Sequence, residues 1–305
     1  MLKKVVLLLV LGVLILCGCG ENRESGGDAP FTVVADQLGR EVAVSQRPER
    51  IISLSPGNTE IAFALGLEER IAGVTDYCNF PAQVEGKARV GGFSDPSLEV
   101  ILELEADLVL AGTMHEELIP QLEALAVPVL VLSPESIDDV YAALMLVAEV
   151  TGNLEEGETL VADLKHRVSL VRSRLESLAE DEKVPVYFEV YSDPLMSTGG
   201  DTLINEIISL AGGRNIFADL AEPYPKVSAE VVVERQPQVI FFPDFHGSAD
   251  LMVEQMKQRP GWERIPALLE NRAYAISDDA FSRPGPRVVD AIEEAAKIFY
   301  PELFN

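Results

Sequence analysis

Short apolar runs alternate with longer amphipathic segments along most of this 305-residue chain. The runs at 50–54 and 71–75 are rich in β-branched residues, and a helix is predicted at 58–65 between them. Further strands are predicted at 108–111, 129–132, 186–190, 239–242 and 273–276. Strands that alternate with helices are typical of βα units, so the pattern predicts an α/β fold with mostly parallel sheets.

One long helix is predicted near the middle of the chain, over residues 155–180. Its apolar residues recur at spacings of three and four, which is the period of an amphipathic helix. They are Leu160, Leu164, Val168, Val171, Leu175 and Leu178. We therefore expect two α/β lobes, 31–154 and 182–305, joined by a connecting helix at 155–181.

The two halves of the chain repeat one another at a constant offset of 131 residues. The offset relates Ser97 to Ser228, Glu99 to Glu230, Asp107 to Gln238 and His115 to His246. Each half is therefore predicted to be one copy of the same α/β unit. Ligands bind beyond the carboxyl ends of parallel strands, so residues that follow equivalent strands are expected to face a shared cleft.

The start of the chain has the pattern of an export signal. Two lysines precede an apolar run, 5–16, which is shorter than the roughly 20 residues of a membrane-spanning helix. The sequence LCGC at 16–19 resembles a bacterial lipobox, which implies removal of a signal peptide, 1–18, and lipidation of Cys19. A flexible tether, 19–30, follows, so we expect a membrane-anchored lipoprotein in a periplasm or on a cell surface. A plain cleaved signal with an incidental cysteine is the alternative.

Acidic side chains greatly outnumber basic ones, with 50 Asp and Glu against 24 Lys and Arg and a formal net charge of −26. Loss of the signal peptide removes two of the lysines and brings the net charge to −28. Such a surface repels phosphate backbones, which excludes nucleic acid as a partner. Once Cys19 is lipidated, Cys78 is the only cysteine in the body of the protein. We expect a monomer whose fold depends on its hydrophobic core, without a disulfide framework.

Three motifs stand out along the chain: RIISLSPGNTE at 50–60, LEADLVL at 104–110 and AGGRNIF at 211–217. They resemble the substrate-binding proteins of ABC importers for cobalamin, iron-siderophores and haem, and the resemblance covers nearly the whole mature chain. It implies a class III periplasmic-binding-protein-like fold, in which a ligand is captured between two lobes and delivered to a membrane permease. Because one long helix joins the lobes, the resemblance also implies that they move little. Three more motifs look most like the cobalamin branch: DYCNFP at 76–81, EPYPKVS at 222–228 and FSRPGPR at 281–287.

The resemblance to the cobalamin branch also implies a set of ligand-binding residues. The expected aromatic or apolar walls are Tyr77, Phe93, Met196 and Tyr224, and the expected polar pair is Asp279 and Arg283. A corrinoid has broad apolar faces that favour aromatic contacts and peripheral amides that need a few polar partners. The structural alternatives are ordinary loop packing for the apolar residues and an internal ion pair for the polar ones.

The chain departs from the cobalamin branch at several of these positions. Phe93 and Tyr224 stand where that branch has tryptophan, and Met196 stands where it has phenylalanine. Gly112 occupies a further tryptophan position. These departures weaken the assignment of cobalamin and leave an iron-siderophore or haem as the alternative ligand.

Glu99 and Glu230 lie two residues after Ser97 and Ser228, the predicted N-caps of equivalent helices. A carboxylate in the first turn stabilises a helix by under about 1 kcal/mol, which is a sufficient structural reason for both acids. The family places an acid at this position on each lobe to dock arginines of the transporter. The resemblance therefore implies that Glu99 and Glu230 dock the permease.

A metal or haem iron held by His115 and His246, with Asp244 or Cys78, is an alternative. Zinc and manganese binders of similar architecture use more histidines than this chain has, since only His166 remains and it lies in the connecting helix. Surface histidines are therefore the preferred interpretation, and no metal site is predicted.

An enzyme is the other class considered. The chain has neither a Gly-x-Ser-x-Gly nucleophile elbow nor a Gly-x-x-x-x-Gly-Lys-Ser/Thr phosphate loop. The Gly199–Thr202 segment can hold an anion, but it also reads as the start of a helix with Asp201 as a cap. The sequence therefore predicts a binding protein without a catalytic cofactor.

Overall fold

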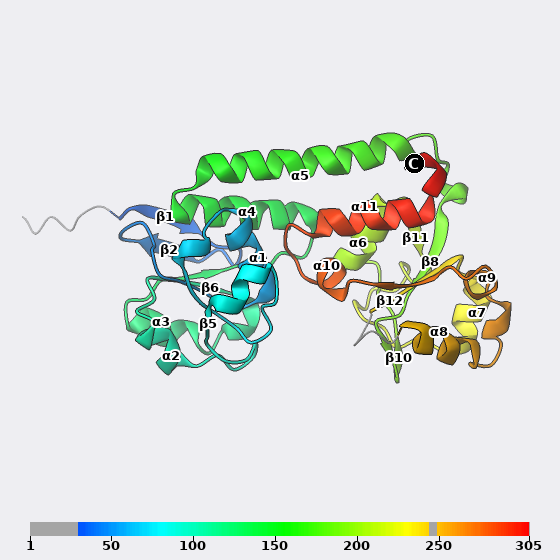
Figure 1. The fold of residues 1–305 in the computed structure, drawn as a ribbon, viewed down its shortest axis with the longest axis horizontal. Coiled ribbons are helices and arrows are strands. Elements are labelled where there is room, and N and C mark those ends of the chain that lie inside the picture. The colour runs from blue at the N-terminus through cyan, green and yellow to red at the C-terminus, as the bar shows by residue number, and fades with distance from the viewer. Residues whose placement is uncertain (1–29, 244–248, 305) are drawn as a thin grey trace, which may run out of the picture.

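Two α/β lobes lie side by side in the structure, a computed structural model that describes residues 30–243 and 249–304 (Figure 1). A single long helix, α5 (Leu154–Leu175), runs along one side of both lobes and connects them. This arrangement confirms the predicted fold class. The predicted signal peptide, Cys19, Asp244 and His246 lie outside the described residues.

The N-terminal lobe is built on a five-stranded sheet in which every pairing is parallel. In spatial order its strands are β5 (Ala88–Arg89), β4 (Ile71–Val74), β3 (Ile51–Ser53), β6 (Leu108–Ala111) and β7 (Val129–Val131). Its helices are α1 (Pro56–Ala64), α2 (Leu98–Glu103), α3 (Ile119–Ala124) and α4 (Ile137–Thr151). Successive residues of β3 point to opposite faces, so Ile51 packs in the layer that contains α1 and α4 while Ile52 packs with α2 and α3.

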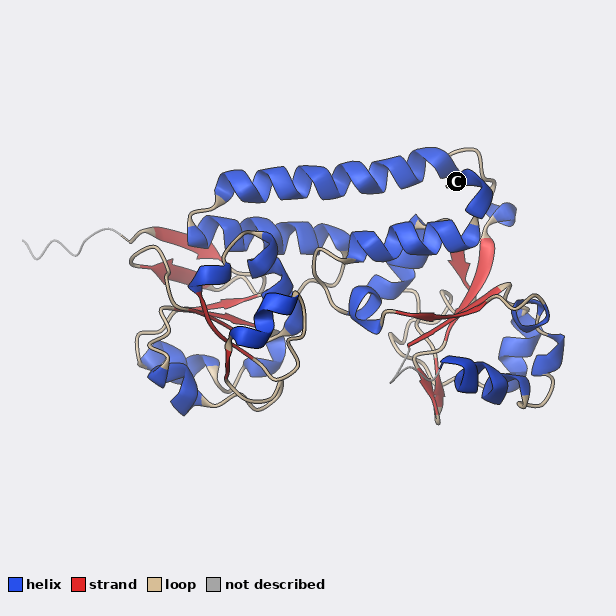
Figure 2. Cartoon of the chain, in the orientation of Figure 1, coloured by secondary structure: helices blue, strands red, loops and turns tan. Residues whose placement is uncertain are grey.

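The C-terminal lobe has a four-stranded sheet that is also fully parallel (Figure 2). In spatial order its strands are β11 (Gly213–Asn215), β8 (Val184–Phe188), β12 (Val239–Pro243) and β13 (Ala273–Ile276). Its helices are α6 (Leu203–Leu210), α7 (Ala229–Arg235), α8 (Ala249–Lys257), α9 (Pro266–Leu269), α10 (Asp278–Ser282) and α11 (Val288–Phe299). Along β12, Phe241 faces the layer with α6 and α11, whereas Phe242 faces the layer with α7 and α8.

Within residues 30–243 and 249–304, two short antiparallel hairpins and six 3₁₀ turns complete the fold. The hairpin strands are β1 (Thr32–Ala35) with β2 (Glu41–Val44), and β9 (Tyr191–Ser192) with β10 (Leu195–Met196). The turns are η1 (Glu68–Arg70), η2 (Ala82–Gly86), η3 (Thr113–His115), η4 (Glu180–Glu182), η5 (Trp262–Arg264) and η6 (Pro301–Leu303). The first hairpin is closed by the buried Asp36, whose Oδ1 accepts from the backbone N–H groups of Leu38 and Arg40 at 3.0 and 2.9 Å.

The connecting helix is shorter than its apolar periodicity predicts, because α5 ends at Leu175. After that residue the chain turns tightly, and the N–H of Leu178 donates to the carbonyl oxygen of Leu175 at 3.0 Å. Leu178 still packs against the core, so the apolar spacing continues beyond the last helical hydrogen bond. No helix in the two described ranges is long and apolar enough to span a bilayer.

A continuous hydrophobic layer runs through both lobes. It contains β3 and α4 in the N-terminal lobe, the buried face of α5, and β12 and α11 in the C-terminal lobe. The residues that α5 buries in it include Val161, Leu164, Val168 and Val171. Displacement of one lobe relative to the other would therefore disturb close-packed side chains as well as the connecting helix.

The structure confirms the 131-residue repeat. Ser97 caps α2 by accepting from the N–H of Val100 at 3.3 Å, and Ser228 caps α7 by accepting from the N–H of Val231 at the same distance. Each capped helix leads to a central strand, β6 or β12, that begins at an equivalent position.

Candidate ligand cleft

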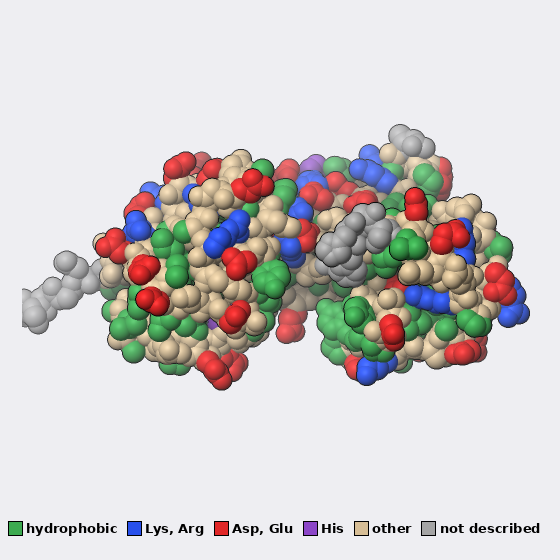
Figure 3. All heavy atoms as spheres, turned by 60° about the horizontal axis from the view of Figure 1, so that its bottom comes forward, with side chains coloured by type: hydrophobic (Ala, Val, Ile, Leu, Met, Phe, Trp, Pro, Cys, Tyr) green, Lys and Arg blue, Asp and Glu red, His purple; other side chains and the backbone are tan. Residues whose placement is uncertain are grey.

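Loops that follow the carboxyl ends of the parallel strands carry three of the predicted aromatic residues. Tyr77 follows β4, Phe93 follows β5, and Tyr224 lies between β11 and α7. Their side chains are exposed by 63%, 36% and 46% respectively. Figure 3 shows the two lobes as separate masses with a hollow between them. Large aromatic side chains that are this exposed, at the carboxyl ends of parallel strands, are typical of a ligand-binding surface.

The repeat relates two of these aromatic residues, which the sequence analysis did not notice. Tyr224 follows Phe93 by 131 residues, the same offset that relates Glu230 to Glu99. Each lobe therefore presents an aromatic side chain and, six residues later, an acid in the first turn of a helix. Both acids are exposed. Backbone hydrogen bonding, then the Ser228 hydroxyl, lowers the pKa of Glu230.

Met196, the fourth predicted wall residue, lies in the short strand β10 and is partly buried. Its backbone forms a bridge to Lys226, which holds the β9–β10 hairpin against the loop of Tyr224. The hairpin also carries Tyr191, which is exposed. The sequence analysis missed Tyr191, although the Asp193–Pro194 pair that follows it is a strong turn signal.

Asp279 and Arg283 form an ion pair in which the nitrogen and oxygen atoms lie 2.5 Å apart. Asp279 lies in α10, and Arg283 follows the last residue of that helix. Both also contact Asn79 of the other lobe. The Asn79 Nδ2 donates to Asp279 at 3.1 Å, and Arg283 donates to the Asn79 Oδ1 at 2.5 Å. The predicted polar pair therefore joins the two lobes in this structure, with both side chains still partly exposed.

Beneath this pair lies a buried carboxylate that the sequence analysis missed. Glu60 of α1 accepts two hydrogen bonds from Arg287, from Nε at 2.8 Å and from a terminal nitrogen at 2.6 Å. Burial raises the pKa of Glu60, while Arg287 and Arg283 oppose that shift. The hydrogen bond to Glu60 in turn raises the pKa of Arg287. A signal was available, because Glu60 and Arg287 each end one of the family-like motifs.

His115 is buried and uses both ring nitrogens inside its own lobe. Its Nδ1 accepts from the N–H of Gly112 at 3.0 Å, which places the proton on Nε2. Nε2 then donates to the carbonyl oxygen of Phe93 at 2.9 Å, and the two rings meet edge to face. His115 therefore supports the Phe93 loop instead of facing the cleft as a free ligand.

Other metal-ligand candidates are dispersed. Cys78 is buried, with its sulfur 3.1 Å from the Thr59 hydroxyl and 3.2 Å from the Thr75 hydroxyl, and His166 is exposed on α5. Across residues 30–243 and 249–304, no three His, Cys, Asp or Glu side chains are grouped to hold a metal ion.

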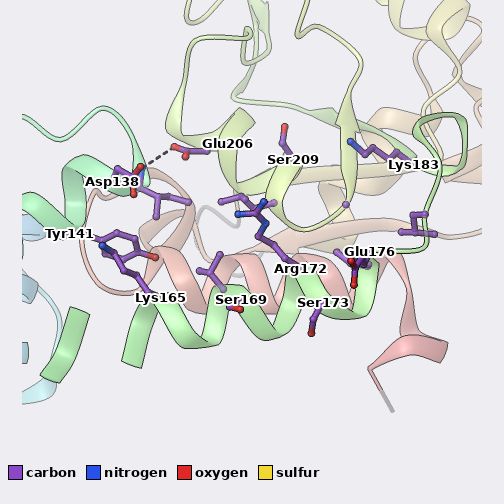
Figure 4. A pocket seen from close by; sticks show the side chains of 16 residues that line it. Asp138, Tyr141, Lys165, Ser169, Arg172, Ser173, Glu176, Lys183, Glu206 and Ser209 are labelled. Atoms are coloured by element: carbon purple, nitrogen blue, oxygen red, sulfur yellow. Dashed lines mark hydrogen bonds between the residues drawn. The ribbon is translucent and has the colours of Figure 1, made fainter. Parts of the chain in front are cut away.

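A separate groove of about 890 Å³ lies between α4, α5 and α6 (Figure 4). Its lining includes Tyr141, whose pKa burial raises to about 12, but none of the predicted ligand residues. At one end the Glu206 carboxylate accepts from the N–H of Ile137 at 2.9 Å. This contact joins α6 of one lobe to α4 of the other, on the side of the molecule where α5 lies.

A sequence profile described as "Periplasmic binding protein" matches residues 51–280. The chain belongs to the periplasmic binding protein family. Two relatives are similar over most of their length: the uncharacterized ABC transporter substrate-binding lipoprotein YvrC of Bacillus subtilis (29% identical, 97% of this chain and 96% of the relative) and a vitamin B12-binding protein of Vibrio parahaemolyticus (30%, 82% and 89%). The periplasmic haem-binding protein RhuT of Roseiflexus sp. RS-1 has a similar structure, with a TM-score of 0.74, 28% identity, and coverage of 84% of this chain and 99% of that protein.

These similarities confirm the predicted family, which includes vitamin B12-binding, haem-binding and iron-binding proteins. Within the periplasmic binding protein family, the chain is an ABC transporter substrate-binding protein and not an enzyme.

Proposed function

We propose that this protein captures cobalamin between its two lobes and delivers it to the permease of an ABC importer. The observation that carries the proposal is the pair of exposed aromatic residues, Phe93 and Tyr224, at equivalent positions of the two lobes. With Tyr77 they offer apolar faces on both sides of the cleft, which suits the broad ring of a corrinoid.

The polar groups between the lobes favour the same ligand class. Arg283 and Arg287 are balanced by Glu60 and Asp279, so the network has no net formal charge. Asp279 and Arg283, the partly exposed members of this neutral network, can accept from and donate to the peripheral amides of cobalamin. The carboxylates of haem and an anionic ferric siderophore call for unbalanced cations. Haem remains the second candidate because of the similarity to RhuT.

Calorimetric titration tests the ligand directly. A soluble form that begins at residue 20 would be titrated with cyanocobalamin and, in parallel, with haem and a ferric siderophore. We expect binding of one cyanocobalamin per protein. Absence of heat with cyanocobalamin, together with binding of haem or siderophore, would overturn the ligand and leave the importer role in place.

Alanine variants connect the ligand to the cleft. Tyr77→Ala and Tyr224→Ala are each expected to weaken binding by about tenfold, since an aromatic contact contributes roughly 0.5–1.5 kcal/mol beyond its buried area. Phe31→Ala is the matched control, because Phe31 is exposed by 44% and lies just before β1, away from the strand-end loops. Equal losses in all three variants would contradict the placement of the site.

Permease docking is assigned to Glu99 and Glu230. The double variant Glu99→Lys/Glu230→Lys is expected to abolish cobalamin uptake by cells while leaving ligand affinity unchanged. The control, Glu103→Lys/Glu234→Lys, makes the same change in net charge at exposed positions of the same two helices. Uptake that survives the first double variant, or is lost equally in the control, would refute the docking role.

The lipid anchor is assigned to Cys19, which lies outside the described residues. Cys19→Ser is expected to release the protein from the membrane fraction and to prevent labelling with a radioactive fatty acid. Cys17→Ser, two residues earlier, is expected to leave both properties unchanged.

A further inference from the structure

Five side chains connect the lobes on the cleft side of the molecule, and we call them the interlobe clasp: Glu60, Asn79, Asp279, Arg283 and Arg287. The first two belong to the N-terminal lobe and the other three to the C-terminal lobe. Figure 1 shows α1 and α10 at facing edges of the two lobes, below the layer formed by α4 and α11.

The deep part of the clasp is the pair Glu60 and Arg287. Their side chains are exposed by 1% and 17%, and two hydrogen bonds of 2.8 and 2.6 Å join the guanidinium to both carboxylate oxygens. The ring of Phe80 covers the Arg287 guanidinium at 4.2 Å. A two-point contact of this kind fixes both distance and orientation, more than a single hydrogen bond does.

The shallow part of the clasp is Asn79 with Asp279 and Arg283, and it touches the deep part. Arg283 lies 3.7 Å from Glu60, and Arg287 lies 3.8 Å from Asp279. A ligand that binds Asp279 or Arg283 therefore changes the electrostatic surroundings of the buried pair as well.

The backbones of the two lobes lie close together beside the clasp. A Cβ atom on Gly57 of α1 would come within 2.9 Å of the carbonyl oxygen of Pro284, and one on Gly285 would come within 3.4 Å of the Glu60 carboxylate. The lobes are thus in direct contact beside the ion pair, so their separation is defined there by short-range contacts.

We propose that Glu60 and Arg287 are positioning residues that set the width of the ligand cleft by clasping α1 to the start of α11. Helix α5, the shared hydrophobic layer and the Glu206–Ile137 contact hold the lobes together on the opposite side, away from the loops that carry the aromatic residues. The clasp supplies the second point of attachment. It keeps the aromatic walls at a fixed spacing, and through the same spacing it holds Glu99 and Glu230 in register for one permease.

The chain contains a matched control for this pair. Glu189 and Arg259 form an equally buried two-point ion pair, with side chains exposed by 1% and 20%, but both belong to the C-terminal lobe. Glu189→Gln and Glu60→Gln each remove one carboxylate charge without changing side-chain volume. Whatever each does to stability, only Glu60→Gln acts between the lobes.

Double electron–electron resonance measures the separation of the lobes without any ligand. Spin labels would be attached at Glu103→Cys and Glu234→Cys, two exposed positions on opposite lobes, while the native Cys78 is 1% exposed and resists labelling. We expect Glu60→Gln to broaden the distribution of distances between the two labels and to shift it to longer distances. We expect Glu189→Gln to give the same distribution as the labelled protein with an intact clasp. Arg287→Lys keeps the charge but loses the two-point contact, and it is expected to broaden the distribution as well.

The proposal is overturned if both clasp variants retain the original distribution, or if Glu189→Gln broadens it equally. If Glu60→Gln does not fold, Arg287→Lys decides between these outcomes. A consequence for affinity rests on the proposed function: Glu60→Gln is expected to weaken cyanocobalamin binding at least tenfold, and Glu189→Gln to leave it within twofold. Because the distance measurement uses no ligand, failure of cobalamin binding would refute the proposed function and leave the clasp test intact.

Discussion

Replacement of Gly57 by alanine places a methyl group where the two lobes touch. Its Cβ would lie 2.9 Å from the carbonyl oxygen of Pro284, and ordinary contacts begin near 3.4 Å, so the backbones must separate by about half an ångström. Overpacking of this kind costs about 1–3 kcal/mol. Alanine in a helix recovers roughly 1 kcal/mol relative to glycine. We therefore expect a net loss of stability of up to about 2 kcal/mol.

Urea denaturation followed by circular dichroism measures this difference as a shift of the midpoint at constant slope. Gly86→Ala is the control, because no atom other than those of its own residue and chain neighbours lies within 4 Å of the position that its Cβ would occupy. A Gly57→Ala protein that is more stable than the parent by about 1 kcal/mol would show that only the helix gain remains. The close contact between the lobes would then be refuted.

Three further predictions concern pH, the cleft and the core. The hydrogen bond from Arg167 lowers the pKa of Glu293, so this pair stabilises the fold above the pKa of the unfolded carboxyl and loses its effect as pH falls through the pKa of the folded carboxyl. In urea titrations, Arg167→Gln should lower the free energy of unfolding by up to about 1 kcal/mol at pH 7 and by less at pH 3. The same loss at both pH values would contradict this account. His115→Ala removes the support of the Phe93 loop and should weaken ligand binding in calorimetry, whereas His115→Gln keeps a donor for the Phe93 carbonyl and should retain most of the affinity. Phe281 is fully buried, and thermal unfolding of Phe281→Ala should show a loss of about 3–5 kcal/mol in the free energy of unfolding. A loss below about 1 kcal/mol would mean that neighbouring side chains move to fill the cavity.

The apolar pattern predicted the central strands closely, because a strand buried on both faces reads as an uninterrupted apolar run. Strand β6 occupies the predicted residues 108–111, and β12 begins at the predicted residue 239 and ends one residue beyond the predicted 242; every residue of both strands is buried. Strand β11 was missed because its residues are Gly, Arg and Asn at the edge of the sheet, where no such run is needed. The end of α5 was placed too late because apolar spacing records burial and not backbone hydrogen bonds.

For the candidate site, the sequence could indicate which loops carry aromatic residues but not which charges are buried. Glu60 and Arg287 each end a family-like motif, but neither motif shows that these two side chains, 227 residues apart, form a buried pair. The role of Asn79 depends in the same way on contacts across the lobes. Pairings at such separation follow from how the lobes meet, which no local pattern records.

The hydrophobic layer shared by β3, α4, α5, β12 and α11 limits how such a protein can be recombined. A chimera that takes one half from this chain and the other from a relative would have to match two sets of side chains along the whole length of α5. The strand-end loops are under no such constraint, since their aromatic tips are exposed. A new ligand preference in this architecture is therefore reached more readily by exchanging loops than by exchanging halves.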